Sequence, residues 1–273
     1  MTSPAHVIRQ GQGEPNLLLH GIGSRAEAWA PVFGAMSPTR DVIAVDLPGF
    51  GRTPLGSVTP TVSGYADYVE GLIAELGVDQ PHIGGSSMGG AIALELGRRG
   101  VARSVVAFSP IGFWRPLGLI WAQTVVGYLR AITPKVRPAL PLLLRSSAGR
   151  VAGFGLVHAA AQTIPADVLI ADADAFASAE AFPSALTAFS EHVFTERGAL
   201  DDIPVTVVWG SRDVILPPRF QARRARQALP DAAHVLLPRC GHIPFADDPV
   251  GCAMLLLHEW RDKAETNVSS AAP

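Results

Sequence analysis

The chain has 273 residues, 22 of them basic and 24 acidic, and its formal net charge at pH 7 is −2. Apolar residues make up 48% and charged residues 17%, which is a globular composition and excludes wholesale disorder. The near-neutral charge argues against a dedicated nucleic-acid-binding protein, and two cysteines are too few for a disulfide-stapled secreted framework. The length allows one domain with an insertion, or two small domains.

The amino terminus lacks a basic stretch followed by an apolar core, so we predict no signal peptide. The longest apolar-looking stretch, Leu117 to Leu129, is well short of the roughly 20 residues that a membrane span needs. We therefore expect a cytoplasmic protein with no integral membrane segment, present as a monomer or a homodimer.

Short apolar runs alternate with longer helical patterns along most of the chain. The runs are apolar on both faces, as expected for strands of a parallel sheet that is covered on each side. Strand, helix and strand in this order indicate βαβ units, and they predict an α/β fold with a mainly parallel central sheet flanked by helices. We predict strands at 17–19, 42–45, 82–84, 104–108, 205–209 and 234–237, and helices at 27–36, 62–76, 88–99, 217–229 and 249–263.

The alternation stops between Ile111 and about Arg197, where prolines separate several helical patterns and no convincing strand occurs. We interpret residues 111–197 as a helical lid inserted between two strands of a core formed by residues 1–110 and 198–265, and residues 266–273 as a flexible tail. The first part of the insertion, 111–150, has six basic residues and no acidic one; the second, 151–196, has six acidic residues and no basic one. Two interpretations stay open: helical layers of complementary charge, or a basic rim that attracts anionic substrates or lipid headgroups.

The strongest motif is Gly84-Gly85-Ser86-Ser87-Met88-Gly89-Gly90, which follows a predicted strand and directly precedes a predicted helix. A serine on such a sharp strand-to-helix turn needs small residues two positions before and two positions after it. Ser87 has glycine at both positions, whereas Ser86 would place Met88 at a crowded one. We therefore predict that Ser87 is a nucleophile. The motif lacks the lysine and the spacing of a phosphate-binding loop.

Four further motifs follow the order typical of one superfamily, so the chain resembles the α/β-hydrolases, in the lid-bearing branch of serine hydrolases and esterases. The resemblance extends from about Leu17 to Arg261 and is weakest in the insertion. That branch includes carboxylesterases, lipases, meta-cleavage-product hydrolases, epoxide hydrolases and haloalkane dehalogenases. The motifs are His20-Gly21-Ile22-Gly23, Asp46-Leu47-Pro48-Gly49-Phe50-Gly51-Arg52, Trp209-Gly210-Ser211-Arg212-Asp213 and Cys240-Gly241-His242-Ile243-Pro244-Phe245.

The resemblance implies a base and an orienting acid for the serine. A serine hydroxyl needs a base to accept its proton, and the base needs an acceptor that fixes its tautomer. In this superfamily the acid and then the histidine follow the nucleophile along the chain, which assigns these roles to Asp213 and His242. Some relatives place the acid after the preceding strand, but Phe108-Ser109-Pro110 offers no carboxylate there.

An oxyanion hole needs backbone N–H groups that point at the developing negative charge. We predict the amide of Met88 as one donor, since it directly follows the nucleophile. The resemblance places the second donor at Ile22, in a loop that we expect His20 to shape by hydrogen bonding.

A serine nucleophile implies an acyl-enzyme that water hydrolyses, whereas relatives that open epoxides or displace halide use aspartate at this position. The sequence therefore predicts a serine hydrolase that cleaves carboxylic esters of medium-sized, apolar small molecules, with no metal and no cofactor. C–C bond hydrolysis of diketone ring-fission products, perhydrolase or haloperoxidase-like activity, and a non-enzymatic small-molecule receptor remain alternatives.

Aromatic side chains of the insertion are candidates for the substrate pocket, together with the residue that follows the predicted base. Most aromatic residues in such a segment pack between helices, so only some of them will contact substrate. We predict that the pocket is lined by Phe113, Trp114, Trp121, Phe154, Phe182 and Ile243, with Tyr128, Phe176 and Phe189 as further candidates.

Overall fold

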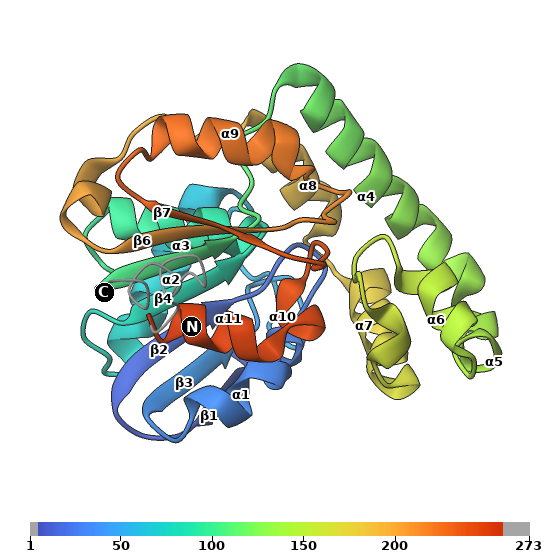
Figure 1. The fold of residues 1–273 in the computed structure, drawn as a ribbon. Helices are drawn as coiled ribbons and strands as arrows, with labels where there is room; N and C mark the ends of the chain where they lie inside the picture. Colours follow the sequence, from blue (N-terminus) through green and yellow to red (C-terminus); the bar gives the residue numbers. More distant parts are fainter. Residues whose placement is uncertain (1–4, 259–273) are drawn as a thin grey trace, which may run out of the picture.

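A seven-stranded sheet forms the centre of the molecule, in the order β1-β3-β2-β4-β5-β6-β7 (Figure 1). The computed structural model describes residues 5–258. Strands β2 to β7 run parallel, and β1 pairs with β3 in the antiparallel sense at one edge. The predicted α/β class and mainly parallel sheet are thus confirmed. The strands are β1 (Val7–Gln10), β2 (Glu14–Leu19), β3 (Arg40–Val45), β4 (His82–Ser86), β5 (Ser104–Phe108), β6 (Val205–Gly210) and β7 (Ala233–Leu237).

The register of the parallel strands brings their carboxyl ends to one edge of the sheet. Gly85 of β4 pairs with Leu19 of β2 and with Ala107 of β5. The loops after these strands therefore meet above β4, in the middle of the sheet, where open parallel sheets commonly bind ligands. Ser87, which follows β4, and the loop that starts at His20, after β2, both lie at this edge.

Helices cover both faces of the sheet, and each cover has its own apolar core. One face packs against α2 (Val62–Glu75), α3 (Met88–Arg98) and α9 (Pro218–Ala228). The other packs against α1 (Ala30–Met36), α10 (Pro244–Asp247) and α11 (Pro249–Leu256), where the Trp29 and Phe245 rings stack with centroids 4.1 Å apart. The predicted helix at 27–36 begins as the 3₁₀ turn η1 (Ala26–Trp29), and a second such turn, η4 (Gly198–Asp202), precedes β6.

The segment between β5 and β6 is helical, and in Figure 1 it extends beyond the sheet. The basic part of this segment (111–150) contacts its acidic part (151–196) through an ion pair between Arg137 and Asp174. Arg130 likewise donates to the backbone carbonyl of Ala177. The Arg137–Asp174 ion pair is thus a contact of complementary charge between the two parts. The helices of the segment are α4 (Pro116–Val136), α5 (Leu140–Leu143), α6 (Ser147–Phe154), α7 (Ala166–Ser178) and α8 (Phe182–Glu191), with the 3₁₀ turns η2 (Arg137–Ala139) and η3 (Ala161–Thr163).

The structure describes only part of the region in which we predicted the last helix and the tail. Helix α11 ends at Leu256, and Leu257 and His258 form a turn, so the helix is shorter than predicted there. Residues 259–263 of the predicted helix 249–263 and the predicted tail at 266–273 lie outside the described residues. Within residues 5–258, no helix combines the length and the apolar character needed to cross a lipid bilayer.

Candidate active site

Ser87 occupies the single-residue turn between β4 and α3. Its backbone torsions, φ 55° and ψ −111°, fall in a region that residues with a side chain rarely adopt. A Cβ at Gly85 would overlap the carbonyl oxygen of Gly89, and a Cβ at Gly89 would overlap the carbonyl oxygen of Leu19. The turn therefore requires glycine at these two positions, and it holds the Ser87 side chain above the carboxyl edge of the sheet.

His242 and Asp213 form a buried pair on the loops that follow β7 and β6. The Nδ1 atom of His242 lies 2.9 Å from Oδ2 of Asp213. The other carboxylate oxygen, Oδ1, accepts hydrogen bonds from the backbone amides of Ile215 at 3.0 Å and Leu216 at 2.8 Å. An ionised carboxylate only accepts hydrogen bonds, so this arrangement places the imidazole proton on Nδ1 and leaves Nε2 free to accept one.

The inserted segment anchors the loop that carries His242. The backbone amides of His242 and Ile243 both donate to the carbonyl oxygen of Val157, at 2.9 and 3.3 Å. On the other side, the Asp247 carboxylate accepts hydrogen bonds from the amides of Ala159, Ala160 and Gly241 at 3.0, 2.7 and 2.7 Å. These hydrogen bonds between the inserted segment and the His242 loop were not predicted, because no pattern in the sequence connects residues 157–160 to residue 242.

The loop after β2 passes close to Ser87. A Cβ added at Gly21 would lie 3.3 Å from the Ser87 Cβ, so this backbone is in contact with the serine. His20 is fully buried and shapes the loop as expected: Nδ1 lies 2.8 Å from the Gly21 carbonyl oxygen, and Nε2 accepts from the Leu47 amide at 3.0 Å. Burial lowers the pKa of His20, so it stays neutral and acts as a bridge between two loops.

The two predicted oxyanion donors, Ile22 and Met88, line the same cavity as the serine. Met88 is the first residue of α3, and a helix provides no carbonyl partner for the amides of its first turn. Within residues 5–258, the Ile22 amide donates no hydrogen bond to a protein acceptor. Ile22, Ser87, Met88 and His242 all line one cavity, which has a volume of about 780 Å³.

The wall of this cavity is mostly apolar and comes largely from the inserted helices. Of the six predicted pocket residues, Trp114, Phe154 and Ile243 line the cavity, as do the three further candidates, Tyr128, Phe176 and Phe189.

The prediction of pocket residues was wrong for Phe113, Trp121 and Phe182, because none of these side chains lines the cavity. Phe113 is buried beside Phe194, with ring centroids 5.2 Å apart, and Phe182 lies under the Arg130 guanidinium. The indole nitrogen of Trp121 donates to the Val214 carbonyl at 2.8 Å, while half of the side chain faces solvent. Helical phase within the insertion decides which rings face the cavity, and that phase depends on packing between helices.

Four ionisable cavity residues were not predicted from the sequence: Arg25, Glu27, His158 and Asp172. The Arg25 guanidinium, on the loop after β2, lies 3.0 Å from Asp172 of α7 and ties the insertion to the core. Burial raises the pKa of Asp172, and Arg25 opposes that shift. His158 is buried, burial lowers its pKa to about 4, and its Nδ1 has no hydrogen-bond partner among the described residues.

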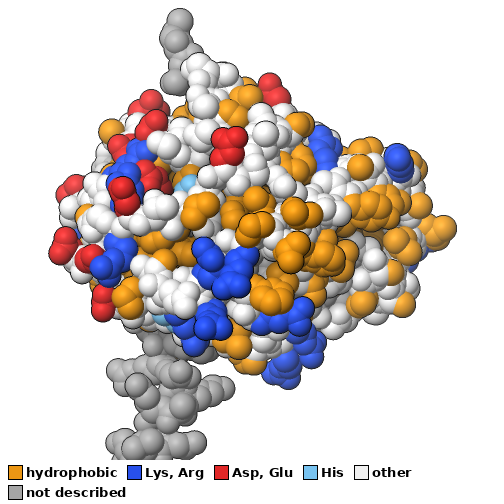
Figure 2. All heavy atoms as spheres, turned by 90° about the horizontal axis from the view of Figure 1, so that it is seen from above, with side chains coloured by type: hydrophobic (Ala, Val, Ile, Leu, Met, Phe, Trp, Pro, Cys, Tyr) orange, Lys and Arg blue, Asp and Glu red, His pale blue; other side chains and the backbone are white. Residues whose placement is uncertain are grey.

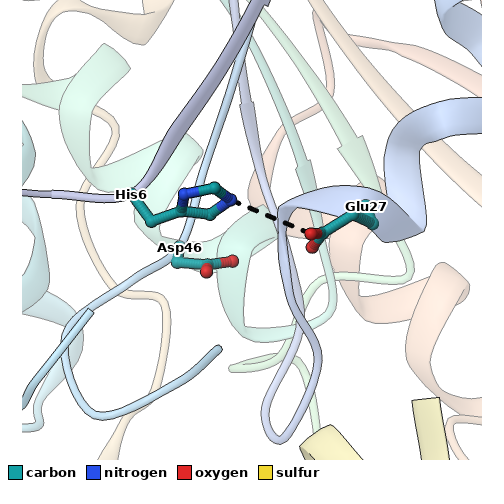
Figure 3. A group of neighbouring side chains, drawn as sticks. All are labelled: His6, Glu27 and Asp46. Carbon is teal, nitrogen blue, oxygen red and sulfur yellow. Dashed lines mark ion pairs between the residues drawn. The ribbon is translucent and has the colours of Figure 1, made fainter. Parts of the chain in front are cut away.

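One cluster of potential metal ligands occurs among the described residues, and Figure 3 shows its members, His6, Glu27 and Asp46. The His6 Nε2 atom is 3.8 Å from the Glu27 carboxylate. The Asp46 carboxylate accepts from the amides of Ala26 and Arg52 at 2.6 and 2.7 Å, and the Arg52 guanidinium lies 3.0 Å from Glu27. These ligand atoms already bind amides and a guanidinium, so the cluster fits a structural role.

The two cysteines, Cys240 and Cys252, are buried free thiols. Burial raises the pKa of Cys240 to about 12, so its thiol stays protonated near neutral pH.

Comparison with known proteins identifies the family of the chain. The sequence profile of the alpha/beta hydrolase family matches residues 17–255, so the chain belongs to that family and is a hydrolase. An uncharacterized protein of Mycobacterium tuberculosis is 28% identical over 250 residues, which cover 88% of this chain and 73% of the relative. The pimeloyl-[acyl-carrier protein] methyl ester esterase of Aromatoleum aromaticum is 31% identical over 260 residues, covering 88% of this chain and 95% of the esterase.

Solved structures share the fold at lower identity. The thermophilic esterase of Thermogutta terrifontis, with malate bound, superposes with a TM-score of 0.67 at 22% identity. The superposition covers 93% of this chain and 92% of the esterase.

Proposed function

We propose that the chain is a serine hydrolase that cleaves carboxylic esters through an acyl-enzyme. Ser87 is the nucleophile, His242 is the general base, and Asp213 orients the imidazole. The observation that carries the proposal is the 2.9 Å contact between His242 Nδ1 and Asp213 Oδ2, together with the cavity that His242 and the strained Ser87 both line. An imidazole with Nδ1 protonated is in the tautomer that accepts the hydroxyl proton at Nε2.

The reaction then follows from the roles of these groups. The Ser87 Oγ attacks the ester carbonyl carbon while its proton passes to Nε2 of His242, and the carbonyl oxygen becomes an oxyanion. The Nε2 proton is returned to the leaving alcohol as the acyl-enzyme forms. Water then attacks the acyl carbon with His242 again acting as base, which releases the acid and restores Ser87.

The backbone amides of Ile22 and Met88 serve as the oxyanion hole in this proposal. Both residues line the cavity beside Ser87, and neither amide competes for an internal acceptor in the hydrogen bonds described above. Loss of one such donor costs about 3 kcal/mol of transition-state stabilisation in hydrolases that use this device. Backbone donors are fixed before substrate binds, so they need no reorganisation during the reaction.

The cavity supports an apolar, medium-sized substrate. Its volume of about 780 Å³ falls in the range of small-molecule sites, and aliphatic and aromatic side chains form most of its wall. The inserted helices act as a lid in this proposal, because they contribute much of that wall and hold the His242 loop through Val157. The similarity to a methyl ester esterase of Aromatoleum aromaticum agrees with an acyl ester as substrate.

A panel of p-nitrophenyl esters with graded acyl length tests the proposal. We expect turnover that rises with acyl length until the cavity is filled. Ser87→Ala should abolish turnover, whereas Ser86→Ala, the matched change at the neighbouring serine, should retain it within about tenfold. Turnover that survives Ser87→Ala would refute the proposal.

C–C bond hydrolysis of diketone ring-fission products would use the same three side chains, so the triad variants do not separate it from ester cleavage. Direct assay of such a diketone beside the ester panel makes that distinction. A ligand that binds tightly while no ester or diketone turns over would instead identify a receptor of the same fold.

A further inference from the structure

The outer surface of α4 and α9 is apolar in a way that the cavity does not explain. Leu117, Ile120, Trp121 and Tyr128 share the solvent face of α4, and their exposed fractions are 82%, 58%, 50% and 62%. Phe220 of α9 is 55% exposed. The two helices adjoin, since a Cβ at Gly118 would lie 3.4 Å from the Gln221 side chain. We name this surface, formed by the outward residues of α4 and α9, the α4–α9 face.

The same face is basic and carries no acidic side chain of its own. Residues 111–150 and 214–230 contain no Asp or Glu. Figure 2 looks onto this side of the molecule, where hydrophobic side chains spread over the surface and Lys and Arg side chains gather beside them. Four arginines of α9 (Arg219, Arg223, Arg224 and Arg226) and Arg115, which directly precedes α4, take part in none of the ion pairs within residues 5–258.

We propose that the α4–α9 face docks on the surface of an anionic lipid bilayer. Exposed aliphatic side chains enter the boundary between headgroups and acyl chains, and aromatic rings such as that of Trp121 favour the same depth. Arginines beside them meet the anionic headgroups, and their stems add apolar contact. The Arg219 guanidinium, which lies 4.7 Å from the Phe220 ring centroid, already presents a cation and an apolar ring together.

Charge and composition favour a bilayer over the other occupants of such a face. A second copy of the chain would bring arginines against arginines in a symmetric contact, which is repulsive. A nucleic acid would use the arginines but gains little from the aliphatic Leu117 and Ile120. An anionic bilayer complements both the charge and the apolar side chains.

The position of the face also bears on substrate access. Tyr128 belongs to the α4–α9 face and lines the cavity, and the exposed side chains of Val136 and Leu143 line the cavity as well. Docking would therefore bring the cavity rim near the bilayer and allow an ester dissolved there to reach Ser87. This access route rests on the proposed function, whereas docking itself does not.

Co-sedimentation with vesicles tests docking without any measure of activity. The full chain is mixed with sucrose-loaded vesicles of phosphatidylcholine alone, or of phosphatidylcholine with phosphatidylglycerol, at low and high salt. We expect binding to the anionic vesicles at low salt and little binding to the neutral ones. Leu117→Asp and Arg223→Glu should each lower the partition coefficient about tenfold, since each introduces a carboxylate into the face.

Val250→Asp is the matched control. Val250 is 65% exposed on α11, which covers the opposite face of the sheet, so this variant should bind vesicles like the parent chain. All three substitutions change exposed side chains, and circular dichroism checks that each variant folds. Absence of vesicle binding would overturn the proposal, as would equal binding by Leu117→Asp and Val250→Asp. If vesicles do not bind, a dimer that Leu117→Asp dissociates would identify a second copy of the chain as the occupant of the face. DNA binding that is lost only in Arg223→Glu would identify a nucleic acid instead.

Discussion

The pair formed by Asp213 and His242 makes a quantitative prediction for Asp213→Asn. The carboxylate accepts three hydrogen bonds, one from His242 Nδ1 and two from the amides of Ile215 and Leu216. An asparagine side chain has one oxygen and one NH₂ group. Turning its oxygen to the two backbone amides keeps both of those bonds, so the NH₂ group faces His242.

That orientation reverses the tautomer of His242. An NH₂ group at the former Oδ2 position makes Nδ1 an acceptor, which places the imidazole proton on Nε2, where it cannot accept the Ser87 proton. The corresponding substitution in serine proteases lowers kcat about 10⁴-fold, or ~5 kcal/mol. We expect a loss of that size in kcat for the best p-nitrophenyl ester, with KM changed much less.

The assay compares kcat of Asp213→Asn with that of Asp201→Asn, a change of the same chemistry at a residue on the surface of η4. Thermal unfolding of both variants checks that the loss is not one of folding. A kcat within about tenfold of the parent chain for folded Asp213→Asn would refute the assigned role of this carboxylate.

Three further predictions concern other parts of the structure. Gly85→Ala should destabilise the chain by about 3 kcal/mol or more in urea unfolding, because its Cβ overlaps the Gly89 carbonyl oxygen; a stable variant would contradict the elbow geometry. The buried His158 has its pKa lowered to about 4, so between pH 6.5 and 4 the unfolded chain binds its proton first, and stability present above pH 6.5 falls by up to ~3 kcal/mol. Urea unfolding across that pH range should show this fall reduced in His158→Phe; identical pH profiles would count against it. In a double-mutant cycle, Arg25→Ala and Asp172→Ala should show a coupling of about 1 kcal/mol, and additive effects would mean that their ion pair contributes nothing.

The features that sequence reasoning predicted well are those set by local rules. All six predicted strands occur, and those in the middle of the sheet, such as β5, are apolar runs that are buried along their whole length. The turn at Ser87 follows from the size of its neighbours, which is a steric requirement visible in the sequence alone. Family membership confirms the fold and the hydrolase class, whereas the catalytic roles of Ser87, Asp213 and His242 stay predictions.

Features that depend on distant contacts were missed. Strand β1 is short and half exposed, and its stability comes from antiparallel pairing with β3, some 35 residues along the chain. Phe113 and Phe182 face other aromatic rings rather than the cavity, since packing between helices sets the phase of the insertion. His158 reaches the cavity because its loop binds the loop of His242, a contact that no periodicity indicates.

The measurement that tests the central claim most directly is covalent labelling with a fluorophosphonate, read by peptide mass spectrometry. This probe captures a serine that is activated for acyl transfer. We predict one adduct, on the peptide that contains Ser87, lost in Ser87→Ala and slowed strongly in His242→Ala. An adduct on another residue, or none in a chain that turns over esters, would contradict the proposal that Ser87 is the activated nucleophile.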